Sequence, residues 1–448
     1  MPLLDIMKKI IDANPTKEFF ISILVRDINI MDAIGDLVDN CIDGAKRLRG
    51  EANYSGLEIQ INISPDSFTI SDNCGGIPIN TAEKYAFRFG RPSEMEATDF
   101  SIGQFGIGMK RALFKLGNNF MVSSSTLTDY FSMSVDVNGW KNKNEWTFDF
   151  ERNGEHVVDV SETGTNINVT SLHDQTKSAF SESSFIQELY NQLELDHMYN
   201  INKGLKIYFN GNLLKSKILN LRVSDSLKVG VWEKDFPNGV SVKLIVGVGP
   251  QDEQAGGWYI FCNDRLIVGP DTSKMTGWTG KMGDGVANYH HQYRRFRGFA
   301  FFNAEDSSNL PWNTTKTGMN TDSPVYKAVR QQMIVMMKVV INGFLNYLKK
   351  ERESGYTGNQ VLHSALKDTN SINIANTEKL SAYYSQDKSF NYPTPDKSSS
   401  VVAPGETTIK FRADKEDVKK VKKFFNVTTN PEVGLKSFQY VIDNEIDF

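Results

Sequence analysis

The chain has 448 residues, of which 40% are hydrophobic and 11% aromatic, so it carries enough apolar material for large cores and is not wholly disordered. Its 50 basic residues face 54 acidic ones, for a net charge of −4, which argues against a protein that coats nucleic acid by bulk charge. Three cysteines form neither a disulfide framework nor a CxxC metal pair. The N-terminus has no secretory pattern and the most apolar helical stretch is too short for a bilayer, so we expect a soluble, cytoplasmic protein.

Helices are predicted over the first 50 residues, the second of them from about Asp32 to Leu48. Alternating apolar and polar residues over 57–70, interrupted by Pro65-Asp66, predict a hairpin, and a glycine-rich loop follows at 74–76. Residues 80–102 are polar and irregular. These patterns predict a mixed helix and strand domain at the start of the chain.

Glycines from 103 to 108 open another predicted helix that ends near Gly117, and strands continue from about 120 to 170. The hydrophobic pattern changes over residues 180–350, where it predicts several apolar strands and a long amphipathic helix from Val325 to about Arg352. A second α/β domain is therefore expected.

Residues 366–405 lack periodicity and contain Pro and Ser, which is typical of a linker. Order is predicted again in the last 43 residues, with a strand over 407–413 and a helix capped by Asp414. The expected division is a first domain over 1–178, a second over 179–352, a linker over 353–405 and a small α/β segment over 406–448.

The helix from 32 to 47 has an apolar stripe and an opposite acidic side. Asp36, Asn40 and Asp43 on that side are spaced four and three residues apart, so they share one ridge. Neighbouring acids repel unless water or a cation compensates them. The ridge is therefore either a solvated face or a metal–phosphate site, for which a neutral amide oxygen such as that of Asn40 is well suited.

Two glycine-containing segments follow. Asp72 ends a strand before Asn73-Cys74-Gly75-Gly76, where a carboxylate accepts from an exocyclic amine or the residues form a plain turn. The segment Gly103-Gln-Phe-Gly106-Ile-Gly108-Met-Lys110 opens a helix, and either cradles phosphate with free N–H groups or is a flexible loop. Its GxxGxG order differs from the dinucleotide fingerprint.

In this order within about 80 residues, the three motifs, followed by Gly164-Thr165, resemble the GHKL ATPases, the superfamily of gyrase, heat-shock chaperones, histidine kinases and MutL. The likeness covers roughly residues 15–175, and "IGQFGIGMKRALFKLG" is most similar to the microrchidia (MORC) and chaperone branches. It implies an α+β fold: a two-layer ATPase sandwich followed by a transducer-like domain, with ATP and Mg²⁺ as cofactors.

The resemblance also implies roles. Asn40 would hold Mg²⁺ between the phosphates, and Asp72 would bind the adenine amine with help from Thr165. Gly76 would lie along the base. Asp36 stands at the position of the catalytic glutamate, which orients and deprotonates the attacking water. Further expected nucleotide contacts are Asp43 and Ile77, and a lid made of Gly103, Gln104, Phe105, Gly106, Ile107, Gly108, Met109 and Lys110.

Two departures from the family pattern stand out. Asp36 is one methylene shorter than glutamate, so its carboxylate lies further back and hydrolysis is expected to be slower. Cys74 replaces a motif glycine, which shifts the bend toward Gly75 and Gly76. From the second domain, Lys316 is the expected lysine that reaches the γ-phosphate, with a solvated loop lysine as the alternative.

The resulting expectation is a Mg²⁺-dependent ATPase that acts as an ATP-gated homodimerisation switch. An ATP-gated interaction module or DNA clamp with little hydrolysis is the alternative, suggested by Asp36 and by analogy. A kinase is disfavoured because no phosphoacceptor helix precedes the site. Residues 406–448 are expected to dock a protein partner, nucleic acid is a further possible ligand, and no membrane is expected.

Overall fold

The structure is a computed structural model with two compact units, residues 1–394 and 395–448, which are described separately. Within its described part, no helix has the length and apolar character needed to cross a membrane. The described residues are 15–50, 53–90, 99–103, 106–280, 285–353, 360–394, 409 and 412–445.

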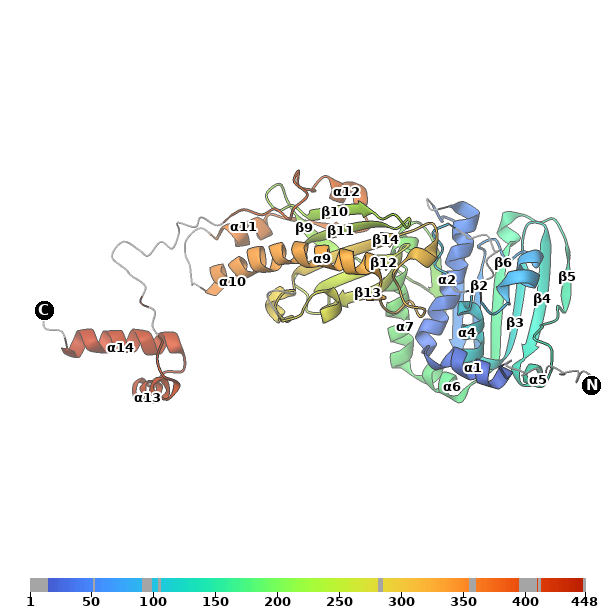
Figure 1. Cartoon of the computed structure of the whole chain (residues 1–448), viewed down its shortest axis with the longest axis horizontal. Helices are drawn as coiled ribbons and strands as arrows, with labels where there is room; N and C mark the ends of the chain where they lie inside the picture. Colours follow the sequence, from blue (N-terminus) through green and yellow to red (C-terminus); the bar gives the residue numbers. More distant parts are fainter. Residues whose placement is uncertain are drawn as a thin grey trace, which may run out of the picture. The chain divides into compact units, whose positions relative to one another are not determined.

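A mixed eight-stranded sheet forms the core of the first half of the larger unit (Figure 1). Its strand order is β5-β4-β3-β6-β2-β1-β7-β8, and only β1 and β7 pair in parallel. The strands are β1 (Glu58–Ser64), β2 (Ser67–Asp72), β3 (Gly117–Ser125), β4 (Asp129–Asp136), β5 (Arg152–Glu155), β6 (Gly164–Leu172), β7 (Lys206–Phe209) and β8 (Asn212–Leu213).

Helices cover one face of this sheet, which gives a two-layer sandwich; α1, α2 and α4 lie side by side there in Figure 1. Burial alternates along β2, β3 and β4 because only one face of the sheet is covered. The helical segments of this half are α1 (Lys17–Arg26), α2 (Ile30–Arg49), α3 (Ile79–Thr81), the π-helical η1 (Ala82–Ala86), α4 (Gly108–Leu116), α5 (Val137–Lys141), the 3₁₀ turn η2 (Val160–Glu162), α6 (Asp174–Ser181), α7 (Ser183–Asp196) and α8 (Met198–Asn202).

The predicted helix over 32–48 is confirmed as α2. Asn29 caps its start by accepting from the backbone N–H of Asp32, and its end is closed by Gly50, whose φ is 66°. The hairpin predicted over 57–70 is confirmed as β1 and β2. The helix expected after the glycines is α4, which begins only at the last of them, Gly108.

Strands β7 and β8 belong to the first sheet rather than to the second domain. Asn210 and Gly211 both have positive φ, 46° and 77°, as a two-residue hairpin turn requires. The chain therefore leaves the first sheet after β8, beyond the expected boundary at 178/179. The sequence pattern misses this because a parallel strand gives no local sign of its partner.

A five-stranded sheet, ordered β10-β11-β14-β12-β13, follows in the same compact unit. β12 is buried at every residue because the sheet is covered on both faces, by α9 to α10 on one side and by β9, β15 and α12 on the other. The elements are β9 (Asn220–Val223), β10 (Gly230–Asp235), β11 (Ser241–Val248), β12 (Gly257–Cys262), β13 (Arg265–Asp271), η3 (Lys274–Thr276), η4 (His291–Tyr293), β14 (Phe296–Asn303), η5 (Ser307–Asn309), α9 (Pro324–Lys338), the π-helical η6 (Val339–Leu345), α10 (Asn346–Glu353), α11 (Val361–Lys367), β15 (Asn370–Asn373) and α12 (Thr377–Ser381).

The expected linker over 353–405 contains folded elements in its first half. β15 pairs with β9, which lies about 150 residues earlier in the chain. Residues 361–381 therefore belong to the larger unit. The sequence did not reveal β15 because this short polar strand is stabilised by a distant partner and has no apolar pattern of its own. The later part of the expected linker, 395–405, lies outside the described residues.

The smaller unit is helical in its described part, with α13 (Lys415–Phe425) and α14 (Asn430–Glu445) packed together. Asp414 accepts from the backbone N–H of Glu416, so the predicted cap and helix are confirmed. Most of the strand predicted over 407–413 lies outside the described residues.

Candidate functional site

A cavity of about 1020 Å³ lies where α2, the end of β2 and the start of α4 meet. Its walls also include the beginning of β6 and the loop that joins β14 to α9. Gln104 and Phe105 lie outside the described residues. Of the predicted site residues, the cavity lining includes Asp36, Asn40, Asp43, Asp72, Gly76, Ile77, Gly103, Gly106, Ile107, Gly108, Met109, Lys110, Thr165 and Lys316.

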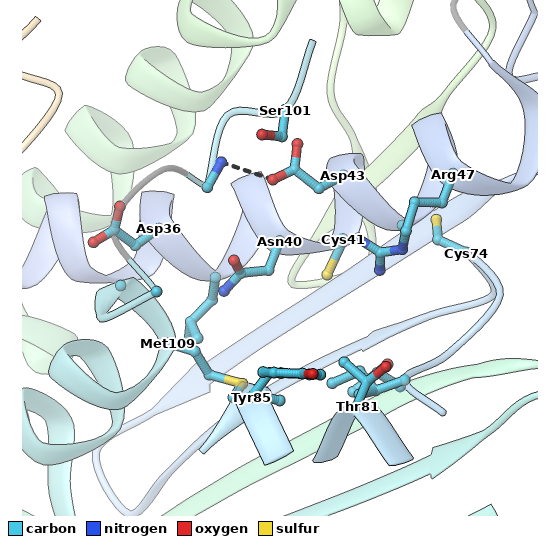
Figure 2. Close-up of a pocket in the computed structure, with 18 of the residues that line it drawn as sticks. Asp36, Asn40, Cys41, Asp43, Arg47, Cys74, Thr81, Tyr85, Ser101 and Met109 are labelled. Carbon is cyan, nitrogen blue, oxygen red and sulfur yellow. Dashed lines mark hydrogen bonds between the residues drawn. The ribbon is translucent and has the colours of Figure 1, made fainter. Parts of the chain in front are cut away.

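The acidic ridge of α2 faces this cavity. Figure 2 shows Asp36, Asn40 and Asp43 in a row along the helix. Asp36 is 3% exposed and Asp43 5%, so the solvated-face alternative is wrong. The side-chain nitrogen of Asn40 is buried and has no hydrogen-bond partner among the described residues, which leaves its amide available to a ligand.

Asp43 holds the start of the glycine-rich segment. Its two carboxylate oxygens accept from the backbone N–H groups of Ile102 and Gly103, both at 2.7 Å. Burial raises the pKa of Asp43, although Lys46 and these two N–H groups favour its ionised form. In this conformation Asp43 positions the segment rather than leaving its oxygens free for a ligand.

The same segment is clamped from the second sheet. Asn263, in the turn after β12, donates to the carbonyl of Ser101 at 3.1 Å and to that of Ala304 at 3.0 Å. Lys46 of α2 donates to the carbonyl of Phe100 at 2.7 Å. Residues from both halves of the larger unit therefore hold the start of the glycine-rich segment at the edge of the cavity.

Asp72 lies at the end of β2, and burial raises the pKa of its carboxyl group. Its Oδ1 accepts from the backbone N–H of Cys74 at 2.7 Å. Gly164 holds φ at +152°, and a Cβ there would approach the carbonyl oxygen of Asp72 to 1.8 Å. The positive φ values of Gly75 and Gly76, 92° and 71°, make the bend that the sequence predicted to shift past Cys74.

The start of α4 supplies positive features to the cavity. No side chain of the described residues caps its first turn, so its leading N–H groups are available to an anion. Lys110 is 3% exposed and donates to the carbonyl of Ala86 at 2.8 Å. Burial lowers its pKa to about 7, because the buried ammonium group loses its hydration.

Lys316 reaches the cavity from the loop between β14 and α9. Its Nζ donates to Oδ1 of Asp36 at 2.9 Å and to Oδ2 of Asp39 at 2.7 Å. The residue is 6% exposed, so the solvated-lysine alternative is wrong. Burial alone would lower the pKa of Lys316, but the two carboxylates outweigh it and raise the pKa.

A buried chain of charges continues from this lysine. Asp39, which is fully buried, also accepts from Nε of Arg265 at 3.1 Å, and Arg265 pairs with Asp196 at 2.9 Å. Burial opposes the ionisation of Asp39, yet Lys316 and Arg265 hold its pKa at about 2. Helix α2 is thus ion-paired to β13 and to the β14–α9 loop of the second sheet.

The sequence analysis missed several lining residues. Thr81 and Tyr85 come from the stretch described there as polar and irregular, and they lie opposite the α2 ridge with Met109 in Figure 2. Arg47 continues α2 by one turn beyond Asp43. Arg111 follows Lys110 directly, and its buried, cavity-lining position has no sequence signal beyond that neighbour.

Residues 28–172 match the family model described as "Histidine kinase-, DNA gyrase B-, and HSP90-like ATPase". This part of the chain is a domain of that ATPase family, and it contains α2, both glycine-rich segments and Thr165. Lys316 lies outside the match. A search of curated proteins found no match to this chain.

Proposed function

We propose that the protein binds ATP with Mg²⁺ in this cavity, hydrolyses it, and uses it to switch between monomer and homodimer. The proposal rests on one observation: residues of four family motifs and Lys316, from the loop between β14 and α9, line the same cavity. A GHKL-type domain suggests nucleotide binding, and the MORC-like assignment rests on the motif resemblance alone.

The adenine end is assigned to the pocket around Asp72. A carboxylate acceptor held by the N–H of Cys74 suits an exocyclic amine, with Thr165 beside it. Gly76 also lines this pocket, and the position requires glycine because its φ is 71° and a Cβ there would lie 2.2 Å from the carbonyl oxygen of Ser125. The phosphates are assigned to the start of α4, where free N–H groups and Lys110 favour anions.

The chain fits a Mg²⁺ ion that is held mainly by phosphate. No group of three acidic, histidine or cysteine side chains suited to a metal occurs among the described residues. Mg²⁺ commonly uses one or two protein ligands together with substrate phosphates and water. Asn40, which lines the cavity, is the proposed protein ligand through its side-chain oxygen, while its unpartnered side-chain nitrogen is placed to donate to a phosphate oxygen. The ion would supply charge neutralisation between the phosphates.

For hydrolysis, Asp36 is the proposed base and Lys316 the proposed electrostatic stabiliser of the transferred phosphoryl group. A second candidate function is nucleotide-gated interaction with little turnover. It is favoured by the fact that both oxygens of Asp36 already accept from cations, Lys316 and Arg111. A carboxylate whose oxygens both accept from cations is a poor base until Lys316 and Arg111 bind another group.

Calorimetry and phosphate release test these proposals. ATP titrated with Mg²⁺ is expected to saturate the protein, and Asp72→Asn is expected to weaken binding. Steady-state phosphate release that disappears in Asp36→Ala supports hydrolysis, whereas binding without Asp36-dependent release supports the gated module. Absence of any heat for ATP or ADP at millimolar concentration would overturn the nucleotide assignment itself.

Dimerisation is proposed by family analogy, and it requires ATP to favour the closed state. Mass measurement with and without a non-hydrolysable ATP analogue tests it, and an unchanged mass contradicts it. Residues 406–448 remain the proposed partner segment, since Phe424 is 71% exposed and Leu435 70%. DNA binding and a cytoplasmic location stay predictions from the sequence. Lys419 and Lys420, in the basic run of α13, pair with neighbouring acids.

A further inference from the structure

Arg111 is a buried cation that faces the cavity with unused donor capacity. It is 5% exposed and lies in the first turn of α4. Its NH2 group donates to Oδ2 of Asp36 at 2.7 Å and to the carbonyl of Thr314 at 3.3 Å. Its Nε is buried and has no hydrogen-bond partner within the described part of the chain. A guanidinium has a fixed fork of five donors, and this one is only partly satisfied.

The carboxylate of Asp36 lies at a point built to attract anions. Oδ2 accepts from Arg111, and Oδ1 accepts from Lys316 at 2.9 Å. The start of α4 is in contact with it, because a Cβ on Gly108 would come within 3.2 Å of the Asp36 carboxyl carbon. An uncapped helix N-terminus, a guanidinium and an ammonium therefore converge on one carboxylate.

We propose that Arg111 is a ligand of the γ-phosphate of ATP, and that the carboxylate of Asp36 accepts from Arg111 until the nucleotide binds. The proposal rests on the ATP-binding function proposed above and extends it to a residue outside the motif-derived set. A terminal phosphate carries more negative charge than a carboxylate and three acceptor oxygens. As the γ-phosphate of ATP it therefore competes for Arg111 and Lys316 together, whereas a diphosphate has no γ-phosphate to reach them.

The exchange has a consequence for Asp36. While both of its oxygens accept from cations, neither is available to a water molecule. Transfer of Arg111 and Lys316 to phosphate leaves a carboxylate oxygen free beside the group to be attacked. Competence for hydrolysis would then arise only in the presence of a triphosphate.

A purely structural ion pair between α4 and α2 is the competing interpretation, and the two differ in nucleotide selectivity. A structural role would weaken triphosphate and diphosphate binding alike. A phosphate ligand would weaken only the triphosphate. Removal of the Asp36 charge separates them further, because it would free the cations for phosphate and strengthen triphosphate binding.

The test is calorimetric titration, with Mg²⁺, of a non-hydrolysable ATP analogue and of ADP into the full chain. Arg111→Gln is expected to weaken analogue binding about tenfold or more, as loss of a charged hydrogen bond does, with ADP changed less than about threefold. Arg111→Lys is expected to recover part of the loss, and Asp36→Asn to tighten analogue binding relative to ADP. Arg152→Gln, the same change on an exposed residue of β5, serves as the matched control.

Equal losses for both nucleotides, or no loss, in Arg111→Gln would overturn the inference while leaving the ATP-binding function intact. If that variant does not fold, Arg111→Lys and Asp36→Asn decide, and an unchanged ratio of analogue to ADP affinity in both would refute it. A wild-type protein that binds neither nucleotide removes the proposed function first, and the inference with it.

Discussion

Asp39 of α2 forms two buried ion pairs with the second half of the larger unit, and Asp39→Asn is predicted to break them while keeping the shape of the side chain. Asp39 is fully buried and contacts two cations, Arg265 and Lys316, from the second sheet. The amide would leave those two cations with one carboxylate fewer. Their burial then becomes a penalty rather than part of a compensated network.

The magnitude follows from two routes. Removing one partner of a buried ion pair costs about 3–5 kcal/mol of unfolding free energy. Independently, the folded-state pKa of Asp39 is about 2, against about 3.9 in an unfolded chain, which corresponds to about 2–3 kcal/mol. Because the folded pKa is depressed, this stability is present above about pH 4 and is lost as the pH falls through about 2.

Urea unfolding at pH 7, followed by circular dichroism, measures the change, with Asp39→Asn expected to lose about 3 kcal/mol. Asp149→Asn is the matched control, because its pair with Lys143 is exposed and is expected to contribute less than about 1 kcal/mol. A double-mutant cycle with Arg265→Gln should show coupling of about 1–3 kcal/mol. An Asp39→Asn loss no larger than that of the control would refute the reasoning.

Three further predictions concern the cavity. Burial lowers the pKa of Lys110 to about 7 and a bound phosphate favours its charged form, so ATP binding near pH 8 should take up a proton. Calorimetric titrations in buffers of different ionisation enthalpy measure this uptake. Lys110→Met should abolish it, and an unchanged uptake in that variant would contradict the prediction. Gly164→Ala should cost about 1–3 kcal/mol and impair ATP binding, since a Cβ meets the Asp72 carbonyl, whereas Gly434→Ala, with nothing within 4 Å, should not. Asp72→Asn should weaken ATP binding about tenfold, and unchanged calorimetric affinity would count against the adenine assignment.

The sequence predicts the elements whose signals are local. The apolar stripe of α2, its cap Asn29 and its closing Gly50 all lie between residues 29 and 50, and the hairpin of β1 and β2 is equally local. The glycine pattern likewise leads to the right helix, α4, because glycine and helix-start chemistry acts over a few residues.

Features that depend on distant partners could not be predicted in this way. β7 is explained by its pairing with β1, and β15 by its pairing with β9. The charge of another α2 residue also depends on the second sheet: Asp39 is ionised and buried because Arg265, 226 residues later, pairs with it. Lys316 was identified by resemblance, whereas Arg111 needed the geometry of its neighbours.

Because residues 99–103 are held by both halves of the larger unit, the cavity cannot be studied in a fragment that contains only the first sheet. A fragment that ends after β8 would lose Asn263, which donates to the carbonyl of Ser101 at the base of the glycine-rich segment, and Lys316, which lines one wall of the cavity. It would also expose Asp39 to solvent and release the segment from one of its two anchors. Drug screening or crystallography on such a truncated piece would therefore report on a different pocket from the one that the intact chain assembles.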